Sequence, residues 1–320
     1  MHLPEIYAVP GLHPFYMRAL EAHFTVHVDP LSKDPAGFAA LAPRIVGLAA
    51  SGESKVPGSL IAQLPALKVV SVFGVGYDGV DVAAARQRGI AVTHTPGVLS
   101  EDVADLAMLL MLGVARGLPR ADQHVRNGLW PAGGLSLGRK VSGARLGIVG
   151  LGRIGQAIAQ RGKGFDMSIA YTARTEKPGS TFAYHASVKA LAAEVDFLVV
   201  ITPGGEGTRH LINAEVLAAL GPQGFLINVA RGSVVDEDAL IAALSSGGIA
   251  GAGIDVFANE PHVPEAFWTL PNVVLTPHIA SATVQTRQAM SDLAFANMQA
   301  GTTGKPVLTM VPELQPKAAA

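Results

Sequence analysis

The sequence of 320 residues contains no cysteine and has no excess of charge of either sign. Lys and Arg number 24 against 25 Asp and Glu, which gives a formal net charge of −1. Without cysteine the chain has no disulfide framework, no thiol nucleophile and no thiolate metal site, and we expect no bound metal. A nucleic-acid footprint would need a basic excess, so the composition argues against a nucleic-acid partner.

Long hydrophobic runs and a targeting segment are lacking as well. The longest apolar stretch, residues 104–115, is interrupted by Asp105 and ends at Arg116, which makes it too short to span a bilayer. The first residues show no basic region followed by a long apolar run, so no secretory signal is expected. These features predict a cytoplasmic protein without membrane contact. Aromatic residues make up 6% of the chain, which is ordinary for a close-packed α/β protein.

One glycine-rich segment stands between a predicted strand and a predicted helix. Gly150, Gly152 and Gly155 follow the apolar run 146–149 at GxGxxG spacing, and a helical pattern begins at residue 156. In such a motif the glycines allow a tight turn, close approach of a pyrophosphate and close packing of helix on strand. The helix N-terminus adds N–H groups and a partial positive charge. The segment predicts a dinucleotide site, and a chance cluster of glycines is the alternative.

Short apolar runs alternate with helical patterns on both sides of this motif, which predicts parallel, doubly wound sheets. Because a complete set of strands precedes the motif, we expect an α/β protein with two Rossmann-like or flavodoxin-like domains. Residues 1–99 plus 285–320 would form a discontinuous substrate-binding domain, and residues 100–284 a nucleotide-binding domain. Strands are expected at residues 5–9, 24–28, 45–48, 67–73, 91–93, 146–149, 167–172, 197–201, 225–228, 251–255 and 273–275.

A long helical pattern, with apolar residues on most faces, covers residues 102–127. A helix this apolar is expected to be buried, either at a domain junction or at a subunit interface, and the pattern therefore favours a homodimer. Trp130 follows in a loop and is one of only two tryptophans. It is either a core or surface aromatic residue or part of an interface.

No acidic residue stands at the end of the strand expected at 167–172. NAD-binding folds place an Asp or Glu there, about 20 residues after the glycines, on the ribose 2′-hydroxyl. Here Ala173 occupies the position, and Arg174 and Thr175 follow. A guanidinium beside a hydroxyl can bind a 2′-phosphate, which a carboxylate would repel. The sequence therefore favours NADP(H), unless Arg174 is a solvated loop charge or stacks on the adenine.

Three polar residues follow predicted strand ends in the second half of the chain. Arg231 comes after residues 226–230, Glu260 after 253–259 and His278 after 274–277. Ligands bind at the carboxyl ends of strands in open α/β sheets, so all three could face one cleft. Arginine can bind a carboxylate, histidine can protonate a developing alkoxide, and glutamate can favour the imidazolium. The set suits hydride transfer to a 2-keto acid. Each residue alone also fits a bland role, as part of a structural salt bridge, a surface acid or a core histidine.

Taken together, these segments resemble the D-isomer-specific 2-hydroxyacid dehydrogenases. Within that family they are most similar to the glyoxylate/hydroxypyruvate reductase and hydroxyphenylpyruvate reductase branch. The matching segments cover nearly the whole chain in family order: residues 72–81, 89–96, 147–155, 226–232, 253–257 with Glu260-Pro261, and 276–281. The resemblance implies that Arg231, Glu260 and His278 are catalytic, with His278 as the proton donor, and that the active site lies in an interdomain cleft.

The resemblance also implies substrate and cofactor contacts. Backbone N–H groups of Val75 and Gly76 would bind the substrate carboxylate, which agrees with the affinity of clustered N–H groups for anions, although a plain turn would look the same. Ser51 and Gly52 would line the pocket, and Trp130 would reach the substrate site of a partner subunit. The cofactor contacts implied are Gly150, Gly152, Arg153, Ile154, Gly155, Ala173, Arg174, Thr175, Thr202, Pro203, Val229, Ala230, Arg231, Asp255, His278 and Ala280.

The implied activity is NADPH-dependent reduction of a small 2-keto acid to the D-2-hydroxy acid. Glyoxylate, hydroxypyruvate, 2-ketogluconate and aryl pyruvates are all open as substrates. A non-catalytic, dinucleotide-sensing protein of the corepressor type is an alternative, disfavoured because Arg231, Glu260 and His278 are all present. A NAD-dependent dehydrogenase acting on formate or phosphoglycerate is disfavoured by Ala173, and the long phosphoglycerate type also by the lack of a further domain after residue 320.

Overall fold

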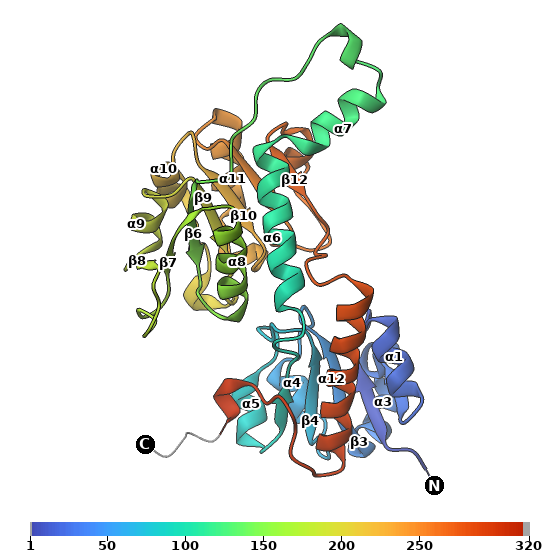
Figure 1. Ribbon diagram of the computed structural model, residues 1–320. Helices are drawn as coiled ribbons and strands as arrows, with labels where there is room; N and C mark the ends of the chain where they lie inside the picture. Colours follow the sequence, from blue (N-terminus) through green and yellow to red (C-terminus); the bar gives the residue numbers. More distant parts are fainter. Residues whose placement is uncertain (1, 316–320) are drawn as a thin grey trace. The chain divides into compact units, whose positions relative to one another are not determined.

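The computed structural model describes residues 2–315 and divides into two compact α/β units. The first unit is formed by the residues up to Leu99 together with those from Ala282 on, and the second by Ser100–Ser281. Each unit contains one parallel sheet with helices packed against it (Figure 1). The expected class, two doubly wound α/β domains, is confirmed.

The first unit is organised around a five-stranded parallel sheet of order β2-β1-β3-β4-β5. Every residue of β4 is buried, as expected for a strand covered on both faces. The order reverses between β1 and β3, which is the switch point where open α/β sheets bind ligands. The strands are β1 (Glu5–Ala8), β2 (Thr25–Val28), β3 (Ile45–Ser51), β4 (Val69–Phe73) and β5 (Ala91–Thr93).

Several helices of the first unit begin at side-chain caps. Asp34, Asp81 and Thr283 each accept a hydrogen bond from a backbone N–H group in the first turn that follows, which satisfies groups with no partner inside the helix. The last helix packs on the sheet, where the hydroxyl of Ser71 donates to the carbonyl of Ala294. The helices are α1 (Pro14–Glu21), α2 (Pro30–Lys33), α3 (Pro35–Leu41), α4 (Gly58–Ala62), α5 (Val82–Gln87) and α12 (Val284–Thr302).

The second unit contains a seven-stranded parallel sheet of order β12-β11-β10-β9-β6-β7-β8. Its switch point lies between β6 and β9, and the central strands β9 and β10 are buried along their whole length. The two-residue strand β8 was not expected from the sequence. The strands are β6 (Arg145–Val149), β7 (Ser168–Thr172), β8 (Ala183–Tyr184), β9 (Phe197–Val200), β10 (Phe225–Asn228), β11 (Gly251–Ile254) and β12 (Val273–Leu275).

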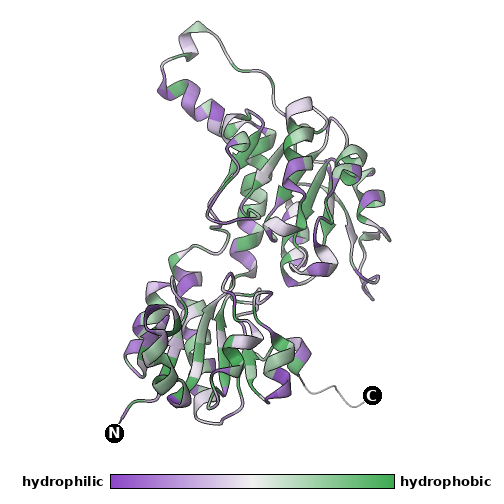
Figure 2. Ribbon diagram, turned by 180° about the vertical axis from the view of Figure 1, so that it is seen from behind, coloured by the Kyte–Doolittle hydropathy of each residue, from purple (hydrophilic) through white to green (hydrophobic). Residues whose placement is uncertain are grey.

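The helices of the second unit either precede or connect these strands. Most of α6 is buried against α8, β10 and β11, and Figure 2 shows its apolar character beside the largely green strands. Arg161 on α8 forms ion pairs with Glu101 and Asp105 on α6. The helices are α6 (Ser100–Ala115), α7 (Leu118–Arg126), α8 (Arg153–Gly164), α9 (Val188–Ala192), α10 (Ala214–Leu220) and α11 (Glu237–Ser246).

The expectation of one buried helix over residues 102–127 was wrong. The helix ends at Ala115, and α7 begins at Leu118 and has no buried residue. Gly117 adopts a left-handed conformation with φ of 58°, which ends the first helix, and Pro119 suits the first turn of the next. In Figure 2, α7 is mostly hydrophilic. Among the described residues, no helix combines the length and the apolar character needed to cross a membrane.

Candidate active site

A histidine and a glutamate form a hydrogen-bonded pair in the second unit. Nδ1 of His278 lies 2.7 Å from Oε2 of Glu260, and the exposed fractions of the two side chains are 27% and 24%. The other carboxylate oxygen, Oε1, accepts a 2.8 Å hydrogen bond from the backbone N–H of Phe257. Because the carboxylate engages Nδ1, Nε2 is the ring nitrogen that can present a proton to a ligand. The pair has the arrangement of a general acid with its orienting group.

Asp255 fixes the backbone on which His278 stands. Its buried carboxylate accepts hydrogen bonds from the hydroxyl of Thr276 at 2.7 Å and from the N–H groups of Ile279 at 2.8 Å and Ala280 at 3.0 Å. The N–H of His278 donates to the carbonyl of Asp255 at 2.8 Å, and His278 has a φ of 51°, which is uncommon for a residue other than glycine. The end of β11 therefore determines where the imidazole lies.

The surroundings shift the pKa values of Asp255 and Glu260 in opposite directions. Burial raises the pKa of Asp255, and the hydrogen bonds from Thr276 and the neighbouring N–H groups offset only part of that effect. Burial also opposes ionisation of Glu260, but the hydrogen bond and charge of His278, the N–H of Phe257 and the charge of Arg231 together bring its pKa below the ordinary value. Glu260 is thus a carboxylate at neutral pH and favours the imidazolium form of His278.

Arg231 lies at the end of the neighbouring strand β10. Its Nη1 donates to the carbonyl of Ala230 at 2.8 Å, and its own carbonyl accepts from the buried amide of Asn228 at 3.2 Å. The carbonyl oxygen of the same amide accepts the N–H of Ala230 at 3.1 Å, so Asn228 holds this turn. The structure thus brings Arg231, Glu260 and His278 together at the carboxyl ends of β10, β11 and β12.

The glycine motif forms the turn between β6 and α8. Gly150 has a φ of 106°, and a β-carbon on Gly155 would lie 2.1 Å from the carbonyl oxygen of Gly150, so neither position tolerates a side chain. A β-carbon at Gly152 would meet nothing within 4 Å. Helix α8 begins at Arg153, and its first N–H groups have no partner within the helix. The open space at Gly152 and these N–H groups fit the pyrophosphate of a dinucleotide.

The expected sugar end of this site follows β7. Ala173 is half-buried, whereas Arg174 and Thr175 are exposed, and no acid occurs at residues 173–175. The loop is tethered, because the hydroxyl of Tyr171 accepts the N–H of Lys177 at 2.7 Å. The guanidinium of Arg174 therefore stands at an open edge beside a fixed strand, where it can contact an anionic group.

The remaining residues expected at the cofactor site lie along the same edge of the sheet. Ile154 belongs to the first turn of α8, while Thr202-Pro203 and Val229-Ala230 follow β9 and β10. Asp255 and Ala280 are both buried and bind each other. The hydrogen bonds that the Asp255 carboxylate accepts from Thr276, Ile279 and Ala280 give it a structural task. A direct contact of Asp255 with the cofactor stays a prediction.

In the first unit, the loops after β3 and β4 touch each other. The N–H of Gly52 donates to the carbonyl of Phe73 at 3.2 Å, which brings Ser51 and Gly52 close to the loop that contains Val75 and Gly76. Sequence reasoning missed His94, whose Nδ1 lies 2.9 Å from the carbonyl oxygen of Val75 and fixes this loop. Its only signal in the sequence was a histidine directly after a predicted strand.

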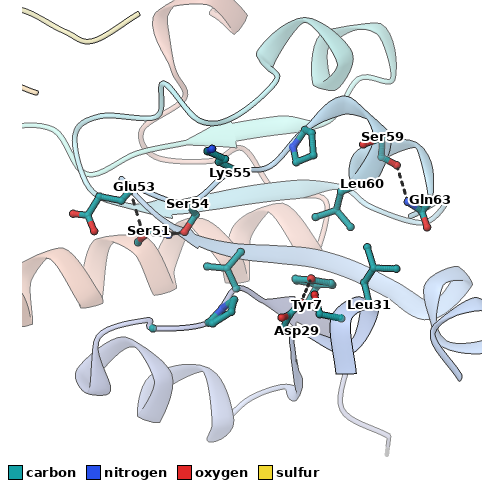
Figure 3. A pocket seen from close by; sticks show the side chains of 15 residues that line it. Tyr7, Asp29, Leu31, Ser51, Glu53, Ser54, Lys55, Ser59, Leu60 and Gln63 are labelled. Carbon is teal, nitrogen blue, oxygen red and sulfur yellow. Dashed lines mark hydrogen bonds between the residues drawn. The ribbon is translucent and has the colours of Figure 1, made fainter. Parts of the chain in front are cut away.

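A pocket of about 600 Å³ opens at the switch point of the first sheet, between loops that follow β1, β2 and β3. In Figure 3, Ser51 and Ser54 lie at one end of it, and Ser59 and Gln63 at the other. The hydroxyl groups of Ser51 and Ser54 are 2.8 Å apart. Lys55, Asp29 and Tyr7 add an ammonium, a carboxylate and a phenol to the lining. This lining can exchange hydrogen bonds with a ligand that carries several hydroxyl groups.

Trp130 lies on a segment that stands out from the second unit and that we call the arm, residues 118–138. The arm leaves α6 after Ala115 and returns where the N–H of Arg139 donates to the carbonyl of that same residue, and Figure 1 shows it extending past the end of α6. Trp130 is 68% exposed and Leu137 is fully exposed. Other apolar side chains exposed on the arm are Leu118, Val125, Leu129 and Leu135.

Comparison with known proteins gives consistent matches. The family described as "D-isomer specific 2-hydroxyacid dehydrogenase, NAD binding domain" matches residues 108–280. The chain is 46% identical over 289 residues to a hydroxyphenylpyruvate reductase from Plectranthus scutellarioides, which covers 90% of this chain and 91% of that protein. It is 43% identical over 308 residues to a 2-ketogluconate reductase from Gluconobacter oxydans, which covers 96% of this chain and 98% of that protein.

A solved structure is similar along almost the whole length of the chain. An NADPH-dependent glyoxylate/hydroxypyruvate reductase from Sinorhizobium meliloti, in complex with NADP and malonate, superposes with a TM-score of 0.90. The two sequences are 46% identical, and the match covers 99% of each chain.

Proposed function

We propose, from the premise that the chain belongs to the D-isomer-specific 2-hydroxyacid dehydrogenase family, that it uses NADPH to reduce a small 2-keto acid to the D-2-hydroxy acid. Within the family the chain lies in the glyoxylate reductase branch. The observation that carries the proposal is the 2.7 Å hydrogen bond between Glu260 and His278, which lie near Arg231. Reduction of a keto acid requires a proton donor for the carbonyl oxygen and a cation for the carboxylate. His278 and Arg231 can supply these two groups.

The proposed roles follow from the chemistry of each group. His278 holds a proton on Nε2 and delivers it to the carbonyl oxygen of the substrate, while Glu260 stabilises the imidazolium until that transfer. Arg231 binds the substrate carboxylate and polarises the carbonyl group. In the first unit, the N–H groups of Val75 and Gly76 bind the carboxylate, and His94 keeps their loop in place. When bound, the reduced nicotinamide supplies the hydride.

A preference for NADP(H) over NAD(H) is part of the proposal. The pyrophosphate would lie at Gly152 and the N-terminus of α8, and the adenosine ribose at the end of β7. Arg174 and Thr175 would then bind the 2′-phosphate, with no carboxylate at Ala173 to repel it. The NADP bound to the similar reductase from Sinorhizobium meliloti supports this preference.

The pocket in the first unit favours a second candidate within the same chemistry, a reductase of a sugar-derived keto acid. Ser51 belongs both to the loop beside Gly52 and to the lining of the pocket. A substrate whose carboxylate is held at Val75 and Gly76 could therefore extend a hydroxylated chain towards Ser54 and Lys55. The 43% identity to a 2-ketogluconate reductase supports this second candidate.

The arm suits a homodimer in which Trp130 contributes to the substrate site of the partner subunit. Six exposed apolar side chains occur on this one segment, and such a concentration of exposed apolar residues suits an interaction surface. Replacing Leu137 with Asp should then convert a dimer to a monomer in analytical ultracentrifugation. A wild-type protein that sediments as a monomer would refute the dimer.

A steady-state panel tests the proposed function. The oxidation of NADPH and of NADH is followed with glyoxylate, hydroxypyruvate, 2-ketogluconate and hydroxyphenylpyruvate. We expect turnover with at least one of these acids and a higher kcat/KM with NADPH. A protein that binds NADPH but oxidises it with none of the four acids would instead be a dinucleotide sensor.

A further inference from the structure

We propose that Glu237 is a positioning residue for Glu260 and that it acts through the backbone N–H of Ala258. This role rests on the proposed function, because the position of Glu260 matters for turnover only if His278 is the proton donor. Glu237 is the first residue of α11 and belongs to a different element from Arg231, Glu260 and His278.

Two carboxylates hold the segment that leads to Glu260. The side chain of Glu260 reaches back to the N–H of Phe257 at 2.8 Å. The side chain of Glu237 accepts the next N–H, that of Ala258, also at 2.8 Å. The bond between Glu260 and Phe257 lies within the turn, whereas the bond between Glu237 and Ala258 connects the turn to α11. Only the second one fixes the turn relative to another element of the unit.

A close backbone contact supports the same link. A β-carbon on Gly232 would lie 1.9 Å from the carbonyl carbon of Phe257 and 2.2 Å from the nitrogen of Ala258. The chain directly after Arg231 therefore lies against the same peptide group whose N–H binds Glu237. Residues 231–237 thus join the arginine and the turn that leads to Glu260 into one local assembly.

The charge and burial of Glu237 distinguish it from an ordinary acid at a helix start. Burial raises its pKa, the N–H of Ala258 works against that rise, and the charges of Asp238 and Glu260 add to it. A half-buried carboxylate beside another carboxylate is an unfavourable arrangement. Favourable interaction with the N-terminus of α11 is also available to Asp238, which is exposed in the same turn. Asp238 therefore provides a matched control.

The experiment compares Glu237→Ala, Glu237→Gln and Asp238→Ala with the wild type. Glutamine keeps a carbonyl oxygen that can accept the N–H of Ala258, and alanine does not. Because misplacement of a reacting group by about 1 Å can cost 10²-fold in rate, we expect kcat of Glu237→Ala to fall about tenfold. KM for the keto acid, the Kd for NADPH and the Tm should change little. Glu237→Gln should restore most of kcat, and Asp238→Ala should match the wild type.

Amide hydrogen exchange provides a readout that does not depend on activity. In the protein without NADPH or keto acid, the peptide that contains residues 257–260 should exchange faster in Glu237→Ala than in Glu237→Gln or Asp238→Ala. Unchanged exchange and unchanged kcat in Glu237→Ala would overturn the proposal.

Other outcomes would also overturn the role of Glu237. Equal impairment of Glu237→Gln and Glu237→Ala would assign the effect to charge rather than to the hydrogen bond. Parallel losses of kcat, Tm and NADPH affinity would make Glu237 a structural residue. A wild type that reduces none of the keto acids would refute the proposed function and this role with it, whereas an active wild type with an unaffected Glu237→Ala would refute this role alone.

Discussion

The two ends of the proposed cofactor edge in the second unit are built in different ways. At the ends of β10 to β12, Arg231, Glu260 and His278 are half-buried. The amide of Asn228 donates to the carbonyl of Arg231, and the carboxylate of Asp255 accepts the N–H of Ile279, so both fix the backbone beside the catalytic residues. At the end of β7, Arg174 and Thr175 are exposed, and the loop is tied through the backbone of Lys177 to the phenol of Tyr171. Hydrogen bonds fix the residues at the ends of β10 to β12, whereas the end of β7 exposes a charged side chain to solvent.

This difference matches the tasks that we propose for the two ends. Proton transfer requires the reacting atoms within hydrogen-bond distance in a fixed geometry, which explains the dense bonding around Glu260 and His278. Binding of a 2′-phosphate requires mainly a cation near the adenosine ribose. An exposed arginine provides this cation, but an ion pair exposed to solvent contributes only modestly to the binding free energy. We therefore expect substitutions at the catalytic end to have larger effects than those at the sugar end.

The largest effect is expected from His278→Ala. Loss of a positioned general acid typically costs about 10²–10⁴-fold in rate, so kcat for reduction of a 2-keto acid should fall within that range. The Kd for NADPH, measured by quenching of protein fluorescence, should stay within about twofold of the wild type, because the proposed phosphate contacts lie elsewhere. A kcat near that of the wild type would show that His278 is not the proton donor.

A smaller effect, on stability, is expected from Asp255→Asn. The amide cannot accept all the hydrogen bonds that Thr276, Ile279 and Ala280 make to the carboxylate, and its NH₂ group would face a donor. A buried donor left without its partner costs about 1–3 kcal/mol, so the free energy of unfolding in urea should fall by about that amount. Unchanged stability would show that Asp255 does not fix the His278 segment.

Arg174→Ala tests the sugar end. A charge-assisted hydrogen bond to a phosphate contributes about 1.5–3 kcal/mol when formed, and exposure reduces this value, so we expect KM for NADPH to rise about tenfold. KM for NADH should change by less than about twofold, since NADH lacks the phosphate. Equal increases for both cofactors would reject the contact with the 2′-phosphate.

The smallest effect is the pH dependence of the Glu260–His278 pair in the absence of cofactor. The pKa of Glu260 in the folded chain is lower than its ordinary value of 4.5, so folding favours the ionised form. The resulting stabilisation is fully present above the unfolded pKa and is lost as the pH falls through the folded pKa.

Glu260→Gln should therefore be less stable than the wild type near neutral pH by up to about 1 kcal/mol. Urea unfolding at a series of pH values should show this difference shrinking as the pH falls below about 5 and through the folded pKa of Glu260, which lies below its ordinary value of 4.5. A difference that grows as the pH falls below about 5 would contradict the depressed pKa of Glu260.

Local patterns in the sequence predicted most of the fold, and they placed the three residues that the family resemblance implies to be catalytic. The short apolar runs identified the main strands, and the glycine spacing placed the turn before α8, because both depend on neighbouring residues. Arg231, Glu260 and His278 were found because each follows a strand, and parallel strands end at one edge. Their roles stay proposals, as does the assignment of the first unit to substrate binding.

Other features depend on contacts that no local pattern encodes. The hydrogen bonds between Glu237 and Ala258 and between His94 and Val75 join residues about twenty positions apart and require the folded loops. The break between α6 and α7 is a different case, because Gly117 and Pro119 are local signals that were outweighed by an apolar pattern. Gly117 and Pro119 together predict that one helix ends and a second helix begins at this point.

The most direct test of the proposed reductase is the stereochemistry of its product from hydroxypyruvate. NADPH and hydroxypyruvate are incubated with the wild type, and the glycerate formed is resolved into its enantiomers while NADPH oxidation is followed. We expect one D-glycerate for each NADPH consumed by the wild type, and almost none with His278→Ala. Formation of L-glycerate, or equal yields from the wild type and His278→Ala, would contradict it.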